Sequence, residues 1–475
     1  MKKRYIKKLD ITLSPLGFGV MRLPQNKDGS FSPEIYDLLA KSHELGINYY
    51  DTGYDYLGGK SETLIRDALV KHVPRNSLYI ADKMPTWRVS DQADIERIFS
   101  TQLERLGVDY IDFYLLHALN KNYWEKLKKL GILEFLEKKR GEGMIHKVGF
   151  SLHDDCDVLQ IIESPYDWDF VLLQINYYDW IIQHAQENYA YLEKRGIPVM
   201  AMEPVGGGRL ANLPFEAESI FREIDPARSP AAWALRYVAA LPNVIVTLSG
   251  MSDISQLKDN VNAVFDIEEP INEEPYNEVM AILRSKNMIS CGGCGYCLGE
   301  CPKKIDIPLC FQKYNDNEMF GVSLEQGDFG YFYFDFVPPD KQAHHCIKCG
   351  ACNKRCPQGV DIPSELQKVH TTAATARLGV EVTDISKLCD NKKVILFGSS
   401  ELGLSYLRIL TSFGIDVYAF CDNNEIIWNT SLEGVKIISP IELSDIKDNA
   451  VVLISSTHYK PINEQLRNMN VKVIN

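Results

Sequence analysis

The strongest constraint on this sequence is a run of four cysteines and a proline that occurs twice. In each copy, two residues separate each of the first three cysteines, and a fourth cysteine follows three residues later, directly before the proline. The two copies are Cys291, Cys294, Cys297, Cys301 and Pro302, and Cys346, Cys349, Cys352, Cys356 and Pro357. Three such sulfurs can converge from one tight loop, and this spacing is that of [4Fe-4S] cluster ligands.

The fourth cysteine of each run decides how the ligands are shared. In bacterial sequences of this kind, the cysteine before the proline binds the other cluster. We therefore expect one cluster on Cys291, Cys294, Cys297 and Cys356, and a second on Cys346, Cys349, Cys352 and Cys301. A pair of zinc sites is the alternative, because CxxC pairs also suit tetrahedral zinc. Zinc would leave cysteines unused in each run and give the repeated Cys-Pro no role, so the spacing favours clusters.

Length and composition place the chain in a broad class. At 475 residues it is too long for one core and should hold two to four domains. A net charge of -13 argues against a general nucleic-acid or anionic-membrane surface. No apolar run is long enough to span a bilayer, and the basic N-terminus reaches Asp10 before any apolar signal region forms. The four cysteines outside the runs are scattered, which fits a reducing cytoplasm.

Short apolar runs alternate with helical stretches over the first 270 residues. Eight such runs are expected as strands: residues 16–21, 48–52, 78–84, 110–117, 147–152, 170–175, 198–204 and 244–250. They are continuously apolar rather than alternating, which is typical of parallel strands covered on both faces. Eight strand-helix units predict an α/β fold, the (β/α)8 TIM barrel. Residues 5–12 could form a hairpin that closes the barrel floor.

Ionisable residues gather where three neighbouring strands are expected to end. Asp51 follows the second strand, Tyr56 lies in the next loop, Lys83 closes the third strand and His117 closes the fourth. Chemistry in TIM barrels takes place at the C-terminal ends of the strands. Each residue alone has a structural explanation, such as a rim salt bridge or a buried histidine. All four in order at these positions indicate proton transfer.

These residues carry a resemblance to the aldo-keto reductase family, in Asp51-Thr52-Gly53-x-x-Tyr56, Ala81-Asp82-Lys83 and Leu115-Leu116-His117. The resemblance covers about residues 5–265 and implies an NAD(P)H-dependent carbonyl reductase with Asp51, Tyr56, Lys83 and His117 as catalytic tetrad. Tyrosine has a pKa of about 10, so a neighbouring cation is needed to favour its ionised form. Lys83, held by Asp51, would be that cation. Tyr56 would protonate the carbonyl oxygen, which His117 would orient.

The same resemblance implies residues for NADP or NAD. Ser151 and Gln174 would hold the nicotinamide carboxamide, and the stretch from Pro204 through Gly206 and Gly208 to Leu210 would cover the pyrophosphate. The adenosine end would lie on Ser249, Gly250, Met251, Gln256 and Asn260, at a helix N-terminus that favours phosphate. Two positions depart from the family: Met202 stands where an aromatic ring commonly stacks, and Met251 where a basic residue often grips a 2'-phosphate. His153, near the end of the fifth strand, could line the pocket, but we favour its interpretation as a solvated loop histidine.

The cysteine runs belong to a second expected domain, residues 271–380, which begins with a linker helix. The 44 residues between Cys301 and Cys346 exceed the spacer of a minimal two-cluster ferredoxin. This segment resembles the helical ferredoxin domains appended to redox enzymes. An aromatic run at residues 331–336 could shield a cluster or dock on the barrel, although core packing is the better interpretation.

The last expected domain covers residues 390–475. Strands at 393–397, 416–420, 435–438 and 451–455, with a helix at 401–413, predict a small doubly wound unit that resembles Rossmann-like domains of polysaccharide and sugar-nucleotide enzymes. The turn from Gly398 to Gly403 keeps two glycines of a dinucleotide fingerprint, but Ser400 replaces the middle one. Asp422 lies close to the offset of a ribose-binding acid. Ligand binding and a structural role remain equally open here.

The expected nicotinamide site and the expected clusters transfer different numbers of electrons. Nicotinamide gives up two electrons as a hydride, whereas each cluster accepts one, and no trusted flavin motif links them. We favour a cytoplasmic carbonyl or alcohol oxidoreductase on small molecules, whose clusters serve a ferredoxin or other redox partner or sense redox state. One alternative is an electron-transfer or assembly protein whose barrel has lost turnover. Another is a reductase of a sugar nucleotide presented by the C-terminal domain.

Overall fold

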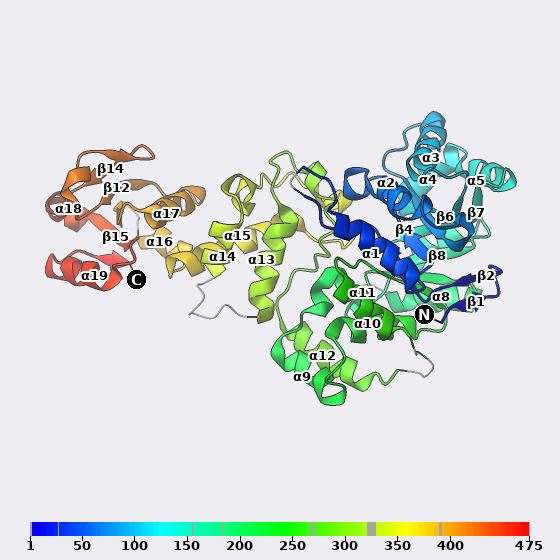
Figure 1. Cartoon of the computed structure of the whole chain (residues 1–475). Coiled ribbons are helices and arrows are strands. Elements are labelled where there is room, and N and C mark those ends of the chain that lie inside the picture. Colours follow the sequence, from blue (N-terminus) through cyan, green and yellow to red (C-terminus); the bar gives the residue numbers. More distant parts are fainter. Residues whose placement is uncertain are drawn as a thin grey trace. The chain divides into compact units, whose positions relative to one another are not determined.

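The computed structural model describes residues 2–26, 28–153, 156–182, 185–265, 267, 271–320, 329–388 and 392–474. The chain forms two compact units, Met1–Lys286 and Asn287–Asn475 (Figure 1). The domain boundaries expected at residues 270, 380 and 390 stay predictions.

The first unit contains a closed barrel of eight parallel strands, in the order β10-β3-β4-β5-β6-β7-β8-β9. The strands are β3 (Leu16–Gly19), β4 (Tyr49–Asp51), β5 (Tyr79–Pro85), β6 (Ile111–Leu119), β7 (Ile145–Leu152), β8 (Phe170–Gln174), β9 (Val199–Met202) and β10 (Val244–Ser249). Each begins and ends within three residues of an expected run. The prediction of an eight-stranded parallel barrel is therefore confirmed.

Helices surround the barrel, as Figure 1 shows. They are α1 (Pro33–Glu44), α2 (Ser61–Ile65), α3 (Gln92–Leu106), α4 (Lys121–Lys129), α5 (Ile132–Gly141), α6 (Cys156–Glu163), α7 (Asp179–Ile182), α8 (Ala185–Arg195), α9 (Phe215–Ile224), α10 (Pro230–Ala239) and α11 (Ile254–Ala263). Local signals set their ends. In α3, the Asp91 side chain accepts a hydrogen bond from the Asp94 amide, and Gly107 ends the helix at φ +65°.

A hairpin closes the floor of the barrel. Strands β1 (Arg4–Ile6) and β2 (Ile11–Leu13) pair antiparallel. Leu9 and Leu13 are buried in one hydrophobic cluster with lumen residues such as Phe113 and Phe170. The opposite end of the barrel, where the strands finish, is thereby left for the site.

Helix α12 (Glu274–Ser285), expected to link to the cysteine domain, packs on the barrel unit. The Tyr276 hydroxyl donates to the Trp233 carbonyl at 3.0 Å, and the Tyr276 ring lies edge-on to Phe221. The sequence analysis grouped this helix with the cysteine domain because the two are adjacent in the chain. Its aromatic contacts with the barrel unit involve residues distant in the sequence, so local patterns did not reveal them.

The second unit begins with an internal repeat. Cys346 lies 55 residues after Cys291, and the later cysteines keep that offset. The backbone repeats as well: φ is positive at Gly293 (+67°) and Lys348 (+55°), and again at Gly295 (+77°) and Gly350 (+71°). Each run is followed by a helix, α13 (Ile307–Phe320) or α15 (Ile362–Leu378). The two runs therefore fold as two copies of one loop-helix element.

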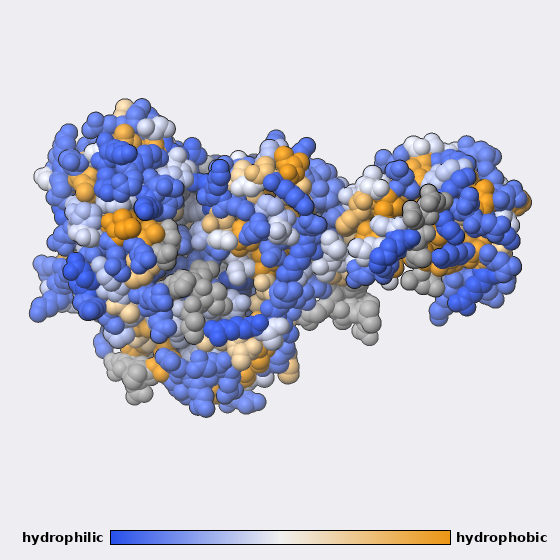
Figure 2. Space-filling view, turned by 180° about the vertical axis from the view of Figure 1, so that it is seen from behind, coloured by the Kyte–Doolittle hydropathy of each residue, from blue (hydrophilic) through white to orange (hydrophobic). Residues whose placement is uncertain are grey.

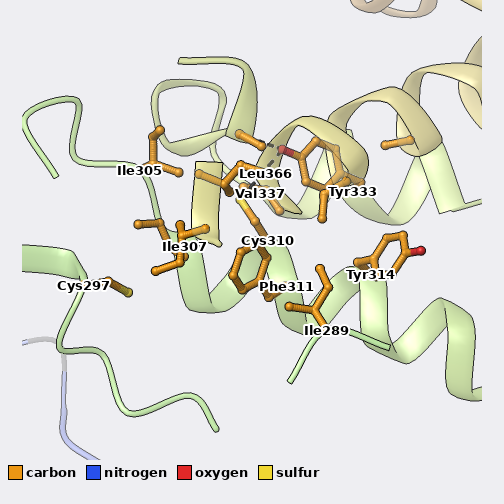
Figure 3. Packing of buried hydrophobic residues seen from close by; sticks show 14 of the residues in the cluster. Ile289, Cys297, Ile305, Ile307, Cys310, Phe311, Tyr314, Tyr333, Val337 and Leu366 are labelled. Atoms are coloured by element: carbon orange, nitrogen blue, oxygen red, sulfur yellow. Dashed lines mark hydrogen bonds between the residues drawn. The ribbon is translucent and has the colours of Figure 1, made fainter. Parts of the chain in front are cut away.

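A common core holds the two copies together. Ile307, Phe311 and Tyr314 of α13 pack with Leu366 of α15 and with α14 (Phe329–Phe336), as Figure 3 shows. In α14 the buried Tyr333 hydroxyl accepts a hydrogen bond from the Ala343 amide at 2.7 Å. Core packing is thus confirmed for part of the aromatic run, although Tyr331 and Phe336 of that run stay exposed.

The C-terminal part of the second unit is a six-stranded sheet in the order β13-β14-β12-β11-β15-β16. Its strands are β11 (Lys393–Phe397), β12 (Val417–Cys421), β13 (Ser431–Leu432), β14 (Val435–Ile438), β15 (Ala450–Ile454) and β16 (Val473–Ile474). Only β13 runs antiparallel to its neighbour. Alternate strand residues enter two cores, one shared with α15, α16 (Val382–Leu388) and α17 (Glu401–Ser412), the other with α18 (Pro440–Ile446) and α19 (Tyr459–Asn468). Helices therefore cover both faces of this sheet.

The surface carries hydrophobic residues in small separate groups among hydrophilic ones, on the face that Figure 2 shows. Among the described residues, no helix is both long enough and apolar enough to cross a membrane.

Candidate functional site

The four residues of the expected tetrad meet at the C-terminal end of the barrel strands. Asp51 is the last residue of β4, and Tyr56 begins the short helical turn that follows. Lys83 lies in β5 and His117 in β6, each two residues before the end of its strand. Both strands end later than expected, and Pro85 pairs with His117 in parallel register. Lys83 and His117 therefore stand inside the barrel wall rather than on its rim.

Lys83 is the charged centre of this group. Its side chain is 1% exposed; it forms an ion pair with Asp51 and donates a hydrogen bond to the Thr52 carbonyl at 2.5 Å. The Lys83 Nζ lies 4.7 Å from the centre of the Tyr56 ring. Burial raises the pKa of Asp51, while the Lys83 ammonium opposes that rise. A fixed cation therefore stands beside the tyrosine.

Tyr56 and His117 face each other. The Tyr56 hydroxyl lies 3.5 Å from His117 Nε2, and the two rings meet edge-on. The backbone around His117 is held on both sides: the Thr86 hydroxyl donates to its carbonyl at 2.8 Å, and the next amide, that of Ala118, donates to the Ser151 hydroxyl at 2.7 Å. A hydroxyl and an imidazole nitrogen are thus placed to contact one oxygen atom between them.

One neighbour of this group escaped the sequence analysis. Trp87, two residues beyond β5, places its ring 4.9 Å from the ring of His117. Its indole N–H donates to Asp55 at 3.2 Å. An aromatic residue directly after a strand that ends at the site was the available signal. Trp87 therefore forms a wall beside the reacting groups.

The residues expected at the nicotinamide lie on neighbouring strands. Ser151 is in β7 and Gln174 ends β8; both are buried. The Gln174 amide donates to Asp179 at 2.8 Å, which fixes its orientation. His153 is half-buried and contacts Gln174, and this burial lowers its pKa to about 4, so it is not the fully solvated loop histidine that the sequence suggested.

The loop expected over the pyrophosphate runs from Pro204 to Leu210. Its three glycines, 206–208, all have positive φ, a conformation that glycine adopts without strain. Two charged residues of this region were missed. Arg209 lies 3.9 Å from Asp179, and Glu203 forms a 2.6 Å ion pair with Arg22 from the loop after β3. Arg209 brings a cation to the place where an anionic cofactor is expected.

The residues expected at the adenosine end are only partly brought together. Ser249 ends β10, and its hydroxyl accepts a hydrogen bond from the Asn260 amide of α11 at 2.8 Å. Gly250 follows Ser249 and lies against Gly19. The Gln256 side chain instead accepts a bond from the Ser252 amide. Met251 is 1% exposed, so its side chain is turned into the core and only its backbone remains for a ligand.

Each expected cysteine quartet lines its own cavity in the second unit. Cys291, Cys294, Cys297 and Cys356 line the first cavity. Cys301, Cys346, Cys349 and Cys352 line the second cavity. Both cavities are partly open to solvent. The structure thus brings together the sulfurs that the spacing paired, with the fourth sulfur exchanged between the runs.

The cavities have the chemistry of a cluster site. Besides sulfur they are lined mainly by aliphatic residues and prolines, and Ile307 stands in the wall of both. The Gly293 amide points to the Cys291 sulfur at 3.5 Å, as amides do around bound clusters. Among the described residues, no group of three or more His, Cys, Asp or Glu could hold a single metal ion. Sulfurs arranged around a cavity suit a cubane better than one zinc ion.

In the turn from Gly398 to Gly403 of the C-terminal sheet, groups of the chain itself satisfy the hydrogen bonds that a ligand could otherwise make. Asp422 accepts bonds from the Ser399 amide at 3.0 Å and from the Ser399 hydroxyl at 2.7 Å. Gly403 lies so close to Gly398 that a Cβ would stand 2.2 Å from the Gly398 carbonyl oxygen. The two glycines and the acid therefore have a structural explanation in this turn.

Comparison with known families agrees with this architecture. Residues 15–284 match the aldo/keto reductase family, and residues 290–361 match a 4Fe-4S dicluster domain. Residues 390–474 match a family described as C2185-like, N-terminal. The chain belongs to the aldo/keto reductase family and is an NAD(P)-dependent oxidoreductase with an iron-sulfur domain.

Individual relatives cover the barrel. An uncharacterized oxidoreductase, YqkF, of Bacillus subtilis is 27% identical over 55% of this chain and 91% of its own length. An NADH-specific methylglyoxal reductase of Escherichia coli is 25% identical over 56% of this chain and 94% of its own. Among solved structures, the holo form of aldo-keto reductase AKR11C1 from Bacillus halodurans is 26% identical, with a TM-score of 0.49, over 59% of this chain and 96% of that one.

Proposed function

We propose that the barrel reduces the carbonyl group of a small molecule, an aldehyde or ketone, with NADH or NADPH. The observation that carries this proposal is the placement of Lys83, paired with Asp51, under the ring of Tyr56, whose hydroxyl faces His117. This is a proton donor with a fixed cation on one side and an orienting imidazole on the other.

Each residue of the tetrad has one task. Tyr56 donates its hydroxyl proton to the carbonyl oxygen, and His117 Nε2 hydrogen-bonds the same oxygen and orients it. The Lys83 ammonium stabilises the negative charge left on the Tyr56 oxygen. Asp51 keeps Lys83 in place and compensates its buried charge. Trp87 limits the volume beside His117 and so contributes to substrate selection.

The residues present fit a nicotinamide dinucleotide at the strand ends. Ser151 and Gln174 offer a hydroxyl and an amide for the carboxamide, and Asp179 orients Gln174. The loop from Pro204 to Leu210 and Arg209 would contact the pyrophosphate. Ser249, Gly250, Gln256, Asn260 and the Met251 backbone would hold the adenosine end. When bound, this cofactor supplies the hydride that the carbonyl carbon receives.

We further propose that each cysteine quartet holds one [4Fe-4S] cluster, which supplies one-electron chemistry when bound. The support is the exchange of the fourth sulfur between the two cavities. A ferredoxin or another one-electron carrier is the fitting partner. The C-terminal sheet is proposed as a Rossmann-like domain that has a structural role in the second unit.

The proposal is tested by comparing Tyr56→Phe with Tyr5→Phe, a matched change at an exposed tyrosine of the hairpin. Purified protein is assayed without oxygen for NADH and NADPH oxidation with methylglyoxal and a panel of aldehydes and ketones. Loss of the proton donor should lower turnover roughly 10²–10⁴-fold. Tyr5→Phe should keep the wild-type rate.

Two results would count against a catalytic barrel. They are an absence of binding of either nicotinamide to the cluster-loaded protein, and equal rates for wild type and Tyr56→Phe. In that case the barrel would be a retained fold and the chain an electron-transfer protein.

A further inference from the structure

The 55-residue repeat carries opposite charges at one of its positions. The residue before the fourth cysteine of each run is Glu300 in the first run and Arg355 in the second. These are equivalent positions of the repeat, since the neighbouring Cys301 and Cys356 are also 55 residues apart. A repeat that keeps its cysteines, its loop backbone and its helices thus carries opposite charges at one place.

Each of the two charges lies in the wall of a different cavity. Arg355 lines the first cavity next to Cys356, and Glu300 lines the second cavity next to Cys301. Arg355 Nε and Glu300 Oε1 are 3.4 Å apart, so the two side chains form one ion pair. The Arg355 side chain is 16% exposed, which limits the screening of its charge by solvent.

We propose that this ion pair sets the two clusters apart in reduction potential, raising that of the cluster in the first cavity and lowering that of the cluster in the second. The inference rests on the proposed assignment of one cluster to each quartet. Reduction adds one electron, taken from an external one-electron donor, to a cluster without forming or breaking a bond. A nearby cation stabilises the added negative charge and a nearby anion opposes it.

The other charges along the cavity walls make the two effects unequal. Lys303 also lines the second cavity, and its counterpart in the repeat, Gln358, lines the first. Lys303 is exposed, and its charge partly offsets that of Glu300. The Glu300 side chain is itself 44% exposed. Removing the Arg355 charge should therefore shift a potential more than removing the Glu300 charge.

The test is an anaerobic redox titration of the full-length, cluster-loaded protein with dithionite, followed by electron paramagnetic resonance. Arg355→Gln should move one reduction wave to lower potential, and Glu300→Gln should move the other wave to higher potential by a smaller amount. Arg355→Lys keeps the charge and should restore most of the shift. Arg408→Gln, which removes an exposed arginine paired with Glu433 outside both cavities, should move neither wave.

Iron content, measured on every variant, separates the two proposals. Wild-type protein that does not bind close to eight irons would defeat the cluster assignment itself. If loaded Arg355→Gln and Glu300→Gln both titrate like wild type, or if both shift their waves in the same direction, the ion pair does not tune the clusters. Should Arg355→Gln fail to load, Glu300→Gln and Arg355→Lys still decide the outcome.

Discussion

At the scale of single residues, Lys83 affects both the stability of the barrel and its proposed chemistry. Its ammonium is buried, compensated by Asp51 and directed at the ring of Tyr56. Burying a charge costs free energy unless the charge is paired. A buried lysine at this position is therefore better explained by a catalytic role than by a structural one. The sequence identified Lys83, Asp51, Tyr56 and His117 because each stands at or just after a strand that the apolar pattern marks.

Lys83→Met should abolish most turnover and also weaken the fold. We expect a rate loss of about 10²-fold or more, because the Tyr56 oxygen loses its cation. Leaving Asp51 buried without a partner should lower the free energy of unfolding by roughly 3–5 kcal/mol, unless Asp51 takes up a proton. Thermal unfolding and steady-state rates measure both effects. Lys41→Met, at an exposed pair with Glu44, should change neither quantity.

A second buried group near Lys83 predicts a pH dependence of stability. Burial raises the pKa of Glu62 from 4.5 to about 7, and its neighbour Asp82 shifts in the same direction. Between these pH values the folded chain holds a proton that the unfolded chain has released. The free energy of unfolding should therefore fall as pH rises from 4.5 to 7.

Glu62→Gln tests that dependence, because glutamine cannot titrate. Denaturant unfolding of wild type and variant across pH 4.5 to 7 should show a flatter profile for the variant. Equal slopes would mean that this buried carboxyl does not hold a proton in the folded chain.

At the scale of elements, the strands were predictable and the longer-range contacts were not. Continuous apolar runs define parallel strands, and the cysteine spacing defines two loops, so both followed from local patterns. The packing of α12 on the barrel, the inward turn of Met251 and the contact of His153 with Gln174 depend on neighbours distant in the chain. Trp87 lies in a turn and Arg209 in the short 3-10 segment Gly206–Ala211, where periodicity gives no signal.

Gly330 lies at a close contact between two helices, α14 and α15. It lies in α14, where an added Cβ would stand 2.5 Å from the Arg377 amide nitrogen and 2.7 Å from the Ala373 carbonyl oxygen of α15. Gly330→Ala should therefore destabilise the second unit by about 1–3 kcal/mol or more. Gly299→Ala, where no atom lies within 4 Å of the added Cβ, is the control in the same unit. Similar melting curves for the two variants would contradict the close packing.

The ligand sets predict how iron responds to single cysteine changes. Wild-type protein, prepared without oxygen, should contain about eight irons and no zinc. Cys294→Ser removes a ligand of the first cavity and should reduce iron toward about four. Cys310→Ser, at a buried cysteine beside Tyr333, should keep the full content. Equal iron in the two variants would remove Cys294 from the ligand set.

At the scale of the whole molecule, two kinds of electron chemistry are carried by one chain. In the proposed function, the barrel handles a hydride and a proton, and the cysteine loops handle single electrons. Among the described residues, we find no motif for a group that would convert one into the other. We therefore propose that the barrel reduces its substrate directly, while the clusters serve a separate carrier or report redox state.

Isotope transfer tests this account most directly. The cluster-loaded protein is given nicotinamide cofactor deuterated at the reactive carbon, in ordinary water, with a carbonyl compound that it reduces, and the alcohol is examined by mass spectrometry and NMR. We predict one deuterium on the former carbonyl carbon and a solvent-derived proton on the oxygen. An alcohol with hydrogen from water on that carbon would show that the electrons had passed through another carrier, and would contradict direct reduction in the barrel.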